Sequence, residues 1–177
     1  MADGILLQSG HLYSYLNPEC NVFTIEDIAL GLSHVCRFGG HLEKHYSVAQ
    51  HSWYVSHAVD QRFALAGLLH DGVEAFLCDI PSPLKAFLKD YRAIEQLHER
   101  ELFRRMDLPY PIPAEVHLAD KQVLAAEVRD LRPASVHWAP LKDVVAYDQW
   151  IKPWSPKKAR EQFLARYYDL TGARTVH

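Results

Sequence analysis

Helix-start signals, each followed by an apolar stripe, constrain the fold of this chain more than any other feature. Thr24 begins a T-x-x-D box and Ser47 begins an S-x-x-Q box, and both patterns are typical of the residue that precedes a helix. Ser155 followed by Pro156 is a third start signal, because proline fits the first turn of a helix. Apolar residues then recur every three or four positions, as on the buried face of a helix. The pattern predicts a chain built mainly from packed helices.

The expected elements follow from these signals and from the breaks between them. We expect helices over about 25–38, 48–59, 62–78, 82–88, 91–106, 114–129 and 156–170. Gly39 and Gly40 would end the first of them. The segment 12–25 has room for one short N-terminal hairpin, and 132–154 has the pattern of a long packed loop with room for one short helix. We expect the whole chain, 1–177, to form one all-α domain, a bundle of about six to eight helices.

Composition limits the compartment and the partners. The net charge is −3 with acidic and basic residues mixed along the chain, so we expect no general electrostatic attraction to polymeric nucleic acid or a membrane surface, although a small basic pocket is compatible with this charge. The three cysteines, Cys20, Cys36 and Cys78, form no CxxC pair, which favours a reducing compartment over a disulfide framework. No apolar run is long enough to span a bilayer, and the N-terminus lacks the pattern of a signal peptide. We therefore expect a cytoplasmic protein.

A group of four ionisable residues directly follows an apolar run. His70 and Asp71 are adjacent, and Glu74 comes about one helical turn later. If the helix 62–78 is continuous, these three side chains project to one side, with Asp79 just past the helix end. Ionisable groups at the end of a buried helix are costly to desolvate unless something such as a cation compensates them. The equally weighted alternative is an ordinary polar helix end with a surface His-Asp pair.

Asp120 interrupts the apolar stripe of the last helix but one. It shares a face with Val116 and Val123, and Glu127 occupies the same stripe seven residues later. Acidic residues rarely occupy core positions unpaired, so we interpret Asp120 as a metal ligand and Glu127 as the structural partner of an arginine. The alternative for Asp120 is an ion pair with a buried arginine such as Arg37.

His51 lies in the first turns of the helix that Ser47 begins. On its own, it would be interpreted as a buried, hydrogen-bonded core histidine. Together with His70, Asp71 and Asp120, it completes a set of two imidazoles and two carboxylates. Such a set suits Zn²⁺, Mn²⁺, Fe²⁺ or Co²⁺ and leaves coordination positions for water and substrate oxygens.

Longer blocks of sequence surround these four residues, namely RFGGH, YSVAQHS, LLHDGVEAFLCDIPSPLK and ADKQVLAAEVRDL. The order H…HD…D is the defining pattern of HD-domain phosphohydrolases, and the sequence resembles them closely over about 12–170. The blocks look like a compact subgroup found in bacteria and their phages. That subgroup is similar to the bacterial 5′-deoxynucleotidases and includes small dATP triphosphohydrolases of phages whose DNA uses diaminopurine.

The resemblance implies a role for each matching position. Glu74 matches the acidic residue that positions or activates the attacking water. Asp79 matches a second carboxylate near the phosphate, which assists proton transfer or holds a second ion, Mg²⁺ or Co²⁺. Arg37 matches an arginine that contacts phosphate or sugar, and Lys85 a lysine that reaches the phosphates. The metal ligands would be His51, His70, Asp71 and Asp120, with Zn²⁺ preferred and Mn²⁺, Co²⁺, Fe²⁺ or Mg²⁺ as alternatives.

The residues around the base are the least defined part of the site. The candidates are Phe38 with Gly39 and Gly40, the stretch 20–23, and the turn 80–81. Glycines would let backbone groups approach a base or sugar closely. The alternative interpretation, at least as well supported, is that Gly39 and Gly40 only end the preceding helix and contact no ligand.

The preferred function is hydrolysis of dATP, a small-molecule deoxynucleotide, to deoxyadenosine and triphosphate. The alternatives are a 5′-deoxynucleotidase acting on dNMPs, a non-catalytic nucleotide-binding HD sensor, and a purely structural helical protein. His51 and His70 are 19 positions apart, closer than in the established 5′-deoxynucleotidases, which weakens any transfer of their substrate preference. The chain is also short for a dGTP triphosphohydrolase. Relatives commonly form dimers or hexamers, so we expect a homo-oligomer, in the host cytoplasm if a phage encodes it.

Overall fold

The computed structural model describes residues 3–133 and 141–173, and helices dominate both ranges. The expected all-α bundle of six to eight helices is confirmed. The α-helices are α1 (Ile25–His34), α2 (Val48–Ala58), α3 (Ala64–Leu69), α4 (Glu74–Leu77), α5 (Ser82–Lys85), α6 (Lys89–Arg105), α7 (Ala114–Leu131) and α8 (Pro156–Thr171). The shorter elements are the 3-10 turns η1 (Pro18–Cys20), η2 (Arg37–Gly40) and η3 (Gln61–Phe63) and the strands β1 (Gly4–Leu6) and β2 (Leu12–Ser14).

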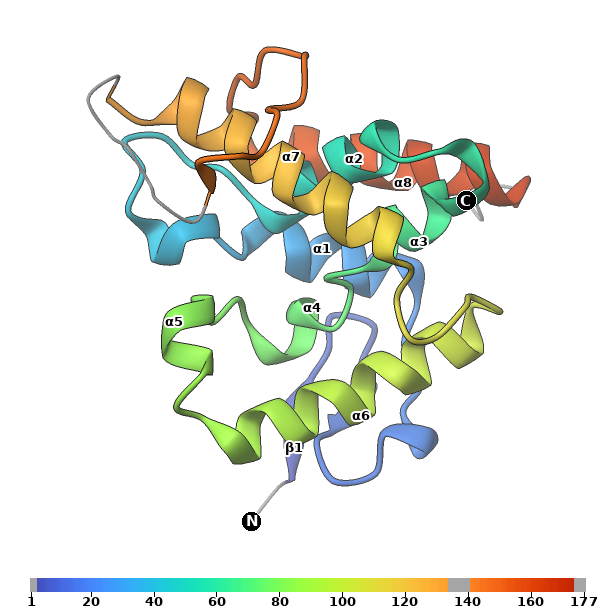
Figure 1. Ribbon diagram of the computed structural model, residues 1–177. Coiled ribbons are helices and arrows are strands. Elements are labelled where there is room, and N and C mark those ends of the chain that lie inside the picture. Colours follow the sequence, from blue (N-terminus) through green and yellow to red (C-terminus); the bar gives the residue numbers. More distant parts are fainter. Residues whose placement is uncertain (1–2, 134–140, 174–177) are drawn as a thin grey trace.

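The helices form two layers (Figure 1). The upper layer consists of α1, α2, α3, α7 and α8, with α2 packed against α3, α7 and α8. The lower layer consists of α4, α5, α6 and the antiparallel hairpin, in which Ile5 pairs with Tyr13. The turn between α3 and α4 joins the layers, and α4 also packs against α1. Residues of this turn can therefore face groups from both layers.

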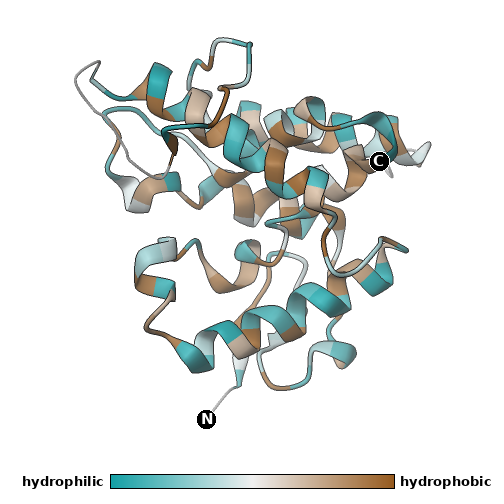
Figure 2. Ribbon diagram, viewed as in Figure 1, coloured by the Kyte–Doolittle hydropathy of each residue, from teal (hydrophilic) through white to brown (hydrophobic). Residues whose placement is uncertain are grey.

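Two hydrophobic clusters hold the layers together. Leu69 and Phe163 are fully buried in the first, and Val55 and Val123 in the second, where Phe103 of the lower layer joins them. Burial of each large apolar side chain stabilises the fold by roughly 1.5–3 kcal/mol. The surface helix α6 is mostly hydrophilic, whereas α3 is largely hydrophobic (Figure 2), which matches their exposed and buried positions.

The predicted helix starts are confirmed where a capping side chain is present. Thr24 and Asp27 form a reciprocal capping box before α1, and Ser47 accepts a hydrogen bond from the Gln50 amide at the start of α2. Ser155 caps α8 in the same way. These signals act within the first turn of each helix, so the start of the helix could be predicted from neighbouring residues alone.

The predicted continuous helix 62–78 is wrong. The chain leaves the α-helix after Leu69 and tightens into a turn, in which the Gly72 amide donates to Leu69 O at 2.9 Å and the Glu74 amide to Asp71 O at 3.0 Å. A Cβ at Gly72 would lie 2.6 Å from Leu102 Cδ2 and 3.0 Å from Leu69 O, so glycine leaves room for the Leu102 side chain of α6 beside the turn. Because of this break, helical spacing does not describe how His70, Asp71 and Glu74 face one another.

The predicted end of the first helix at Gly39 and Gly40 is also wrong. The helix α1 ends at His34, and Cys36 pairs with Ser47 in an isolated antiparallel bridge. Val35 and Cys36 therefore have extended backbone conformations before η2 begins. The glycines instead continue η2, with φ of 60° at Gly39 and 78° at Gly40.

The predicted ends of other helices differ from the observed ends by smaller amounts. The helix expected over 82–88 is only α5, because the amides of Phe87 and Leu88 bond three residues back rather than four. The helix α6 begins two residues earlier than expected, and α7 continues to Leu131. Residues 134–140 of the predicted long loop lie outside the described residues. Among the helices of the described ranges, none is long and apolar enough to cross a bilayer.

Candidate metal centre

The predicted ligands lie on three separate elements that meet between the layers. His51 is on α2, Asp120 is on α7, and His70 and Asp71 are in the turn after α3. His51 is completely buried and His70 nearly so. Ligand atoms of His51, His70 and Asp120 all lie within 4.8 Å of one another. The structure therefore brings together residues 69 positions apart in the sequence.

Asp71 adjoins this triad. Its Oδ2 lies 3.1 Å from His70 Nε2 and 3.7 Å from His51 Nε2. Asp120 approaches from the other side, with its Oδ1 3.1 Å from His51 Nε2. All four predicted ligands thus face one small volume, two imidazoles against two carboxylates.

The hydrogen-bond network assigns the tautomer of both imidazoles. His51 Nδ1 lies 2.6 Å from Glu127 Oε1, and His70 Nδ1 lies 2.9 Å from Gly67 O. Both oxygens can only accept, so both Nδ1 atoms carry the proton, and in the neutral rings Nε2 keeps its lone pair. Each Nε2 is buried without a hydrogen-bond partner among the described residues. Two orphaned lone pairs aimed at two carboxylates fit a divalent cation.

The charges of the site also favour a cation. Burial and the charge of Arg37 lower the pKa of His51, but the carboxylates of Glu127 and Asp120 outweigh them and the pKa rises to about 9. Burial raises the pKa of Asp71, yet the contact with His70 holds it below its usual range. The carboxylates that favour a proton on an imidazole favour a metal ion for the same reason.

Glu127 is a central residue of the site that the sequence interpretation only half identified. Its predicted pairing with an arginine is confirmed, because Arg37 Nη2 lies 2.9 Å from its Oε2. Its contact with His51 was missed, although Glu127 follows Asp120 on the same helical stripe, which was the available signal. The alternative partner for Asp120 is wrong: Arg37 pairs with Glu127, and Asp120 faces His51 instead.

Glu74 and Lys85 form a second group beside the triad. Glu74 is nearly buried, and its Oε2 has no hydrogen-bond partner among the described residues. Burial and the charges of Asp71 and Asp79 raise its pKa. Lys85 Nζ lies 3.7 Å from Glu74 Oε1 and 2.6 Å from Glu95 Oε1, so two carboxylates already hold the lysine. The pairing with Glu95 was not predicted, since nothing in the sequence relates α5 to that face of α6.

Asp79 lies just past α4, half-buried. Burial raises its pKa, while the positive charge of Arg37 opposes the shift. Phe38 and Gly39, predicted near the base or phosphate, lie in η2 next to Arg37, both with positive φ. The guanidinium carbons of Arg37 and Arg132 lie 5.6 and 4.7 Å from the centre of the Phe38 ring. Two guanidinium groups, those of Arg37 and Arg132, therefore lie beside η2.

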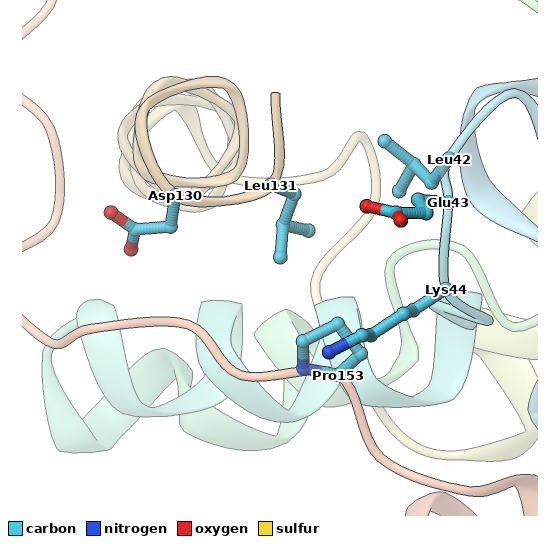
Figure 3. A pocket seen from close by; sticks show the side chains of 6 residues that line it. All are labelled: Leu42, Glu43, Lys44, Asp130, Leu131 and Pro153. Carbon is cyan, nitrogen blue, oxygen red and sulfur yellow. The ribbon is translucent and has the colours of Figure 1, made fainter. Parts of the chain in front are cut away.

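A separate pocket of about 160 Å³ lies near the C-terminal end of α7 (Figure 3). It contains none of the predicted ligands, and one of its charged groups, Asp130, already binds Arg129 and the Ile151 amide. We therefore do not place the chemistry there. The lining residues are Leu42, Glu43, Lys44, Asp130, Leu131 and Pro153.

Comparison with known proteins assigns the chain to a family. It is 38% identical over 168 residues to the protein YfdR of Escherichia coli (strain K12), an alignment that covers 94% of each chain. The chain belongs to the YfdR family. The protein RCAP_rcc00048 of Rhodobacter capsulatus is 35% identical over 123 residues, 64% of this chain and 63% of that one. Both relatives are described as "uncharacterized protein", so neither name indicates an activity. No family model matches the chain.

Proposed function

We propose that this chain is a metal-dependent phosphohydrolase of the HD type that acts on deoxynucleotides. The observation that carries the proposal is the pair of buried imidazoles whose Nδ1 atoms are fixed by acceptors and whose unpartnered Nε2 atoms face two carboxylates. Burying four such groups is costly unless a cation compensates them. The order of these residues along the chain adds the resemblance to HD-domain phosphohydrolases.

The metal is proposed to be Zn²⁺, with Mn²⁺, Co²⁺, Fe²⁺ or Mg²⁺ as alternatives. Two imidazole nitrogens with carboxylate oxygens form a donor set that Zn²⁺ and its neighbours in the first row accept readily. The residues that would hold it are His51, His70, Asp71 and Asp120. A divalent cation bound there supplies positive charge that polarises a phosphoryl oxygen and acidifies a water molecule.

The protein's own residues supply the remaining functions. Glu74 is buried beside Asp71 with one free carboxylate oxygen, so it is suited to orient a water and to take its proton. Lys85 donates to Glu95 and lies 3.7 Å from Glu74 Oε1, so in this arrangement its charge faces these two carboxylates rather than a phosphate. Arg37 brings a fixed positive charge to the edge of the ligand group. Asp79 would assist proton transfer or help hold a second ion, Mg²⁺ or Co²⁺, with substrate.

The preferred substrate is dATP. Water oxygen bonds to the α-phosphorus, the bond from that phosphorus to O5′ breaks, and a proton ends on the 5′-hydroxyl of the released deoxyadenosine, leaving triphosphate. The guanidiniums of Arg37 and Arg132 lie close to the Phe38 ring, and positive charge there would favour a substrate that carries several phosphates. Hydrolysis of dNMPs to orthophosphate is the second candidate. The enzyme is proposed to act in the cytoplasm as a homo-oligomer, a dimer or hexamer.

A product analysis tests this proposal. The purified chain is incubated with dATP, the other dNTPs and the dNMPs in the presence of Zn²⁺, Mn²⁺, Co²⁺ or Mg²⁺. Triphosphate and deoxyadenosine in equal amounts support the preferred reaction, whereas orthophosphate from dNMPs with dATP untouched supports the second candidate. Nucleotide binding without turnover in any metal would favour a sensor. Glu115→Gln on the exposed start of α7 is a matched control for carboxylate variants.

A further inference from the structure

We propose that Glu127 is a positioning residue that couples the metal-binding His51 to the substrate-facing Arg37. This inference rests on the proposed function and adds a residue that orders two parts of the site at once. Glu127 is fully buried on α7, in line with Asp120, and it lies in contact with a predicted ligand without belonging to the ligand group.

Three donors from separate parts of the chain fix the Glu127 carboxylate. His51 on α2 donates to Oε1 at 2.6 Å, and Tyr46, just before α2, donates to the same oxygen at 2.9 Å. Arg37 in η2 donates to Oε2 at 2.9 Å. Hydrogen bonds to both oxygens restrict rotation of the carboxylate, so Oε1 stays directed at His51.

The first consequence concerns the imidazole of His51. Because Oε1 accepts a hydrogen bond from Nδ1–H, the ring keeps its Nε2 lone pair facing Asp71 and Asp120. Partners of this kind typically orient a metal-bound histidine and make it a better ligand. Without the Glu127 carboxylate, Nδ1 would be a buried donor lacking its acceptor, and no hydrogen bond would favour the tautomer that leaves the Nε2 lone pair free.

The second consequence concerns Arg37. Its Nη2 is held by Glu127, which leaves Nη1 3.9 Å from Asp71 Oδ2, too far for a hydrogen bond. If the charge of Glu127 is removed, the attraction of Asp71 is the strongest one left close to the guanidinium. Arg37 would then move toward Asp71 and compete with the cation for that carboxylate. Loss of Glu127 therefore weakens the metal site through His51 and through Asp71 together.

The test is a titration of metal-free protein with Zn²⁺ alone, against a competing chelator of known affinity. Glu127→Gln is expected to bind Zn²⁺ about 10- to 100-fold more weakly than wild type. Tyr46→Phe removes one of the three donors and is expected to weaken binding by roughly two- to fivefold. Glu115→Gln, the same chemical change on the exposed start of α7, should bind as wild type does. Thermal unfolding of each metal-free variant shows whether it is folded.

The outcomes separate the two proposals. If wild type binds no Zn²⁺, Mn²⁺ or Co²⁺, the metal centre and the role of Glu127 are both refuted. If wild type binds Zn²⁺ and folded Glu127→Gln binds it equally well, Glu127 is only structural and the proposed function stands. If Glu127→Gln does not fold, Tyr46→Phe decides: weakened Zn²⁺ binding supports the coupling, and unchanged binding overturns it.

Discussion

Gly31 offers the sharpest test of how the two layers are held together. It lies within α1, where that helix meets α4 of the lower layer. A Cβ at position 31 would lie 2.7 Å from Ala75 O and 2.9 Å from both Ala75 Cα and Cβ. Two of these three atoms belong to the backbone, so no side-chain rotation relieves the clash. We predict that Gly31→Ala forces α4 away from α1.

The magnitude follows from two opposing effects. Alanine in place of glycine favours a helix interior by about 1 kcal/mol. Overpacking of a well-packed contact costs typically ~1–3 kcal/mol, and a clash with backbone belongs at the upper end. The clash therefore wins, and Gly31→Ala should lower the free energy of unfolding by about 2 kcal/mol. With a denaturant slope of about 2 kcal/mol per M, the urea midpoint should fall by about 1 M.

Urea unfolding followed by circular dichroism measures the effect. The double variant Gly31→Ala/Ala75→Gly is the informative companion, because it removes the Ala75 Cβ but leaves the Ala75 backbone in place. It should recover only part of the lost stability. A Gly31→Ala protein as stable as wild type, or more stable, would show that α1 and α4 do not approach as described.

The remaining predictions concern the metal and the lower layer. His70→Ala and Asp71→Ala should each lose bound metal and all detectable turnover, as measured by metal analysis and product release; retention of both would support the purely structural alternative. Removing metal with a chelator should abolish turnover, and Zn²⁺ at about 100 times its Kd should stabilise the metal-free protein by about 2.7 kcal/mol in thermal unfolding, with no shift if the site binds no metal. His98 is buried between Tyr13 and the Tyr15 carbonyl, and burial lowers its pKa. As the pH falls, the unfolded chain therefore takes up a proton at His98 before the folded chain does. The contribution of neutral His98 to the stability of the fold is thus present above pH ~6.5 and is lost as the pH falls below it. The urea midpoint should fall less steeply with acid in His98→Gln than in wild type, and equal slopes would contradict the assignment.

The features that could be predicted from the sequence are those with local causes. Thr24, Ser47 and Ser155 each satisfy backbone amides within their own first turn, so the helix starts they mark do not depend on tertiary structure. The break after Leu69 has no such local signal. Leu102 of α6 lies close to Gly72 within the break, and the sequence does not show which helix packs against that glycine.

The same distinction applies to the candidate site. Asp120 could be identified because an acidic residue inside an apolar stripe is unusual wherever the helix packs. The contact between Glu127 and His51 joins residues 76 positions apart, and the one between Lys85 and Glu95 depends on how α5 folds back on α6. Neither contact leaves a local pattern. The sequence thus identified the residues that need compensation, while the structure identified the partners that provide it.

The division of the site between layers has a consequence for how its functions can be separated. The upper layer carries His51, Asp120 and Glu127, whereas Glu74 belongs to α4 of the lower layer. The α1–α4 contact at Gly31 therefore sets where Glu74 lies relative to His51 and Asp120, and it reaches the ligand group only through Asp71, whose carbonyl accepts a hydrogen bond from the Glu74 amide. Displacing α4 should slow turnover but weaken Zn²⁺ binding less than Glu127→Gln does, because His51 and Asp120 lie on α2 and α7. If both variants lose metal affinity equally, the two layers act as one unit and this separation of binding from water activation is wrong.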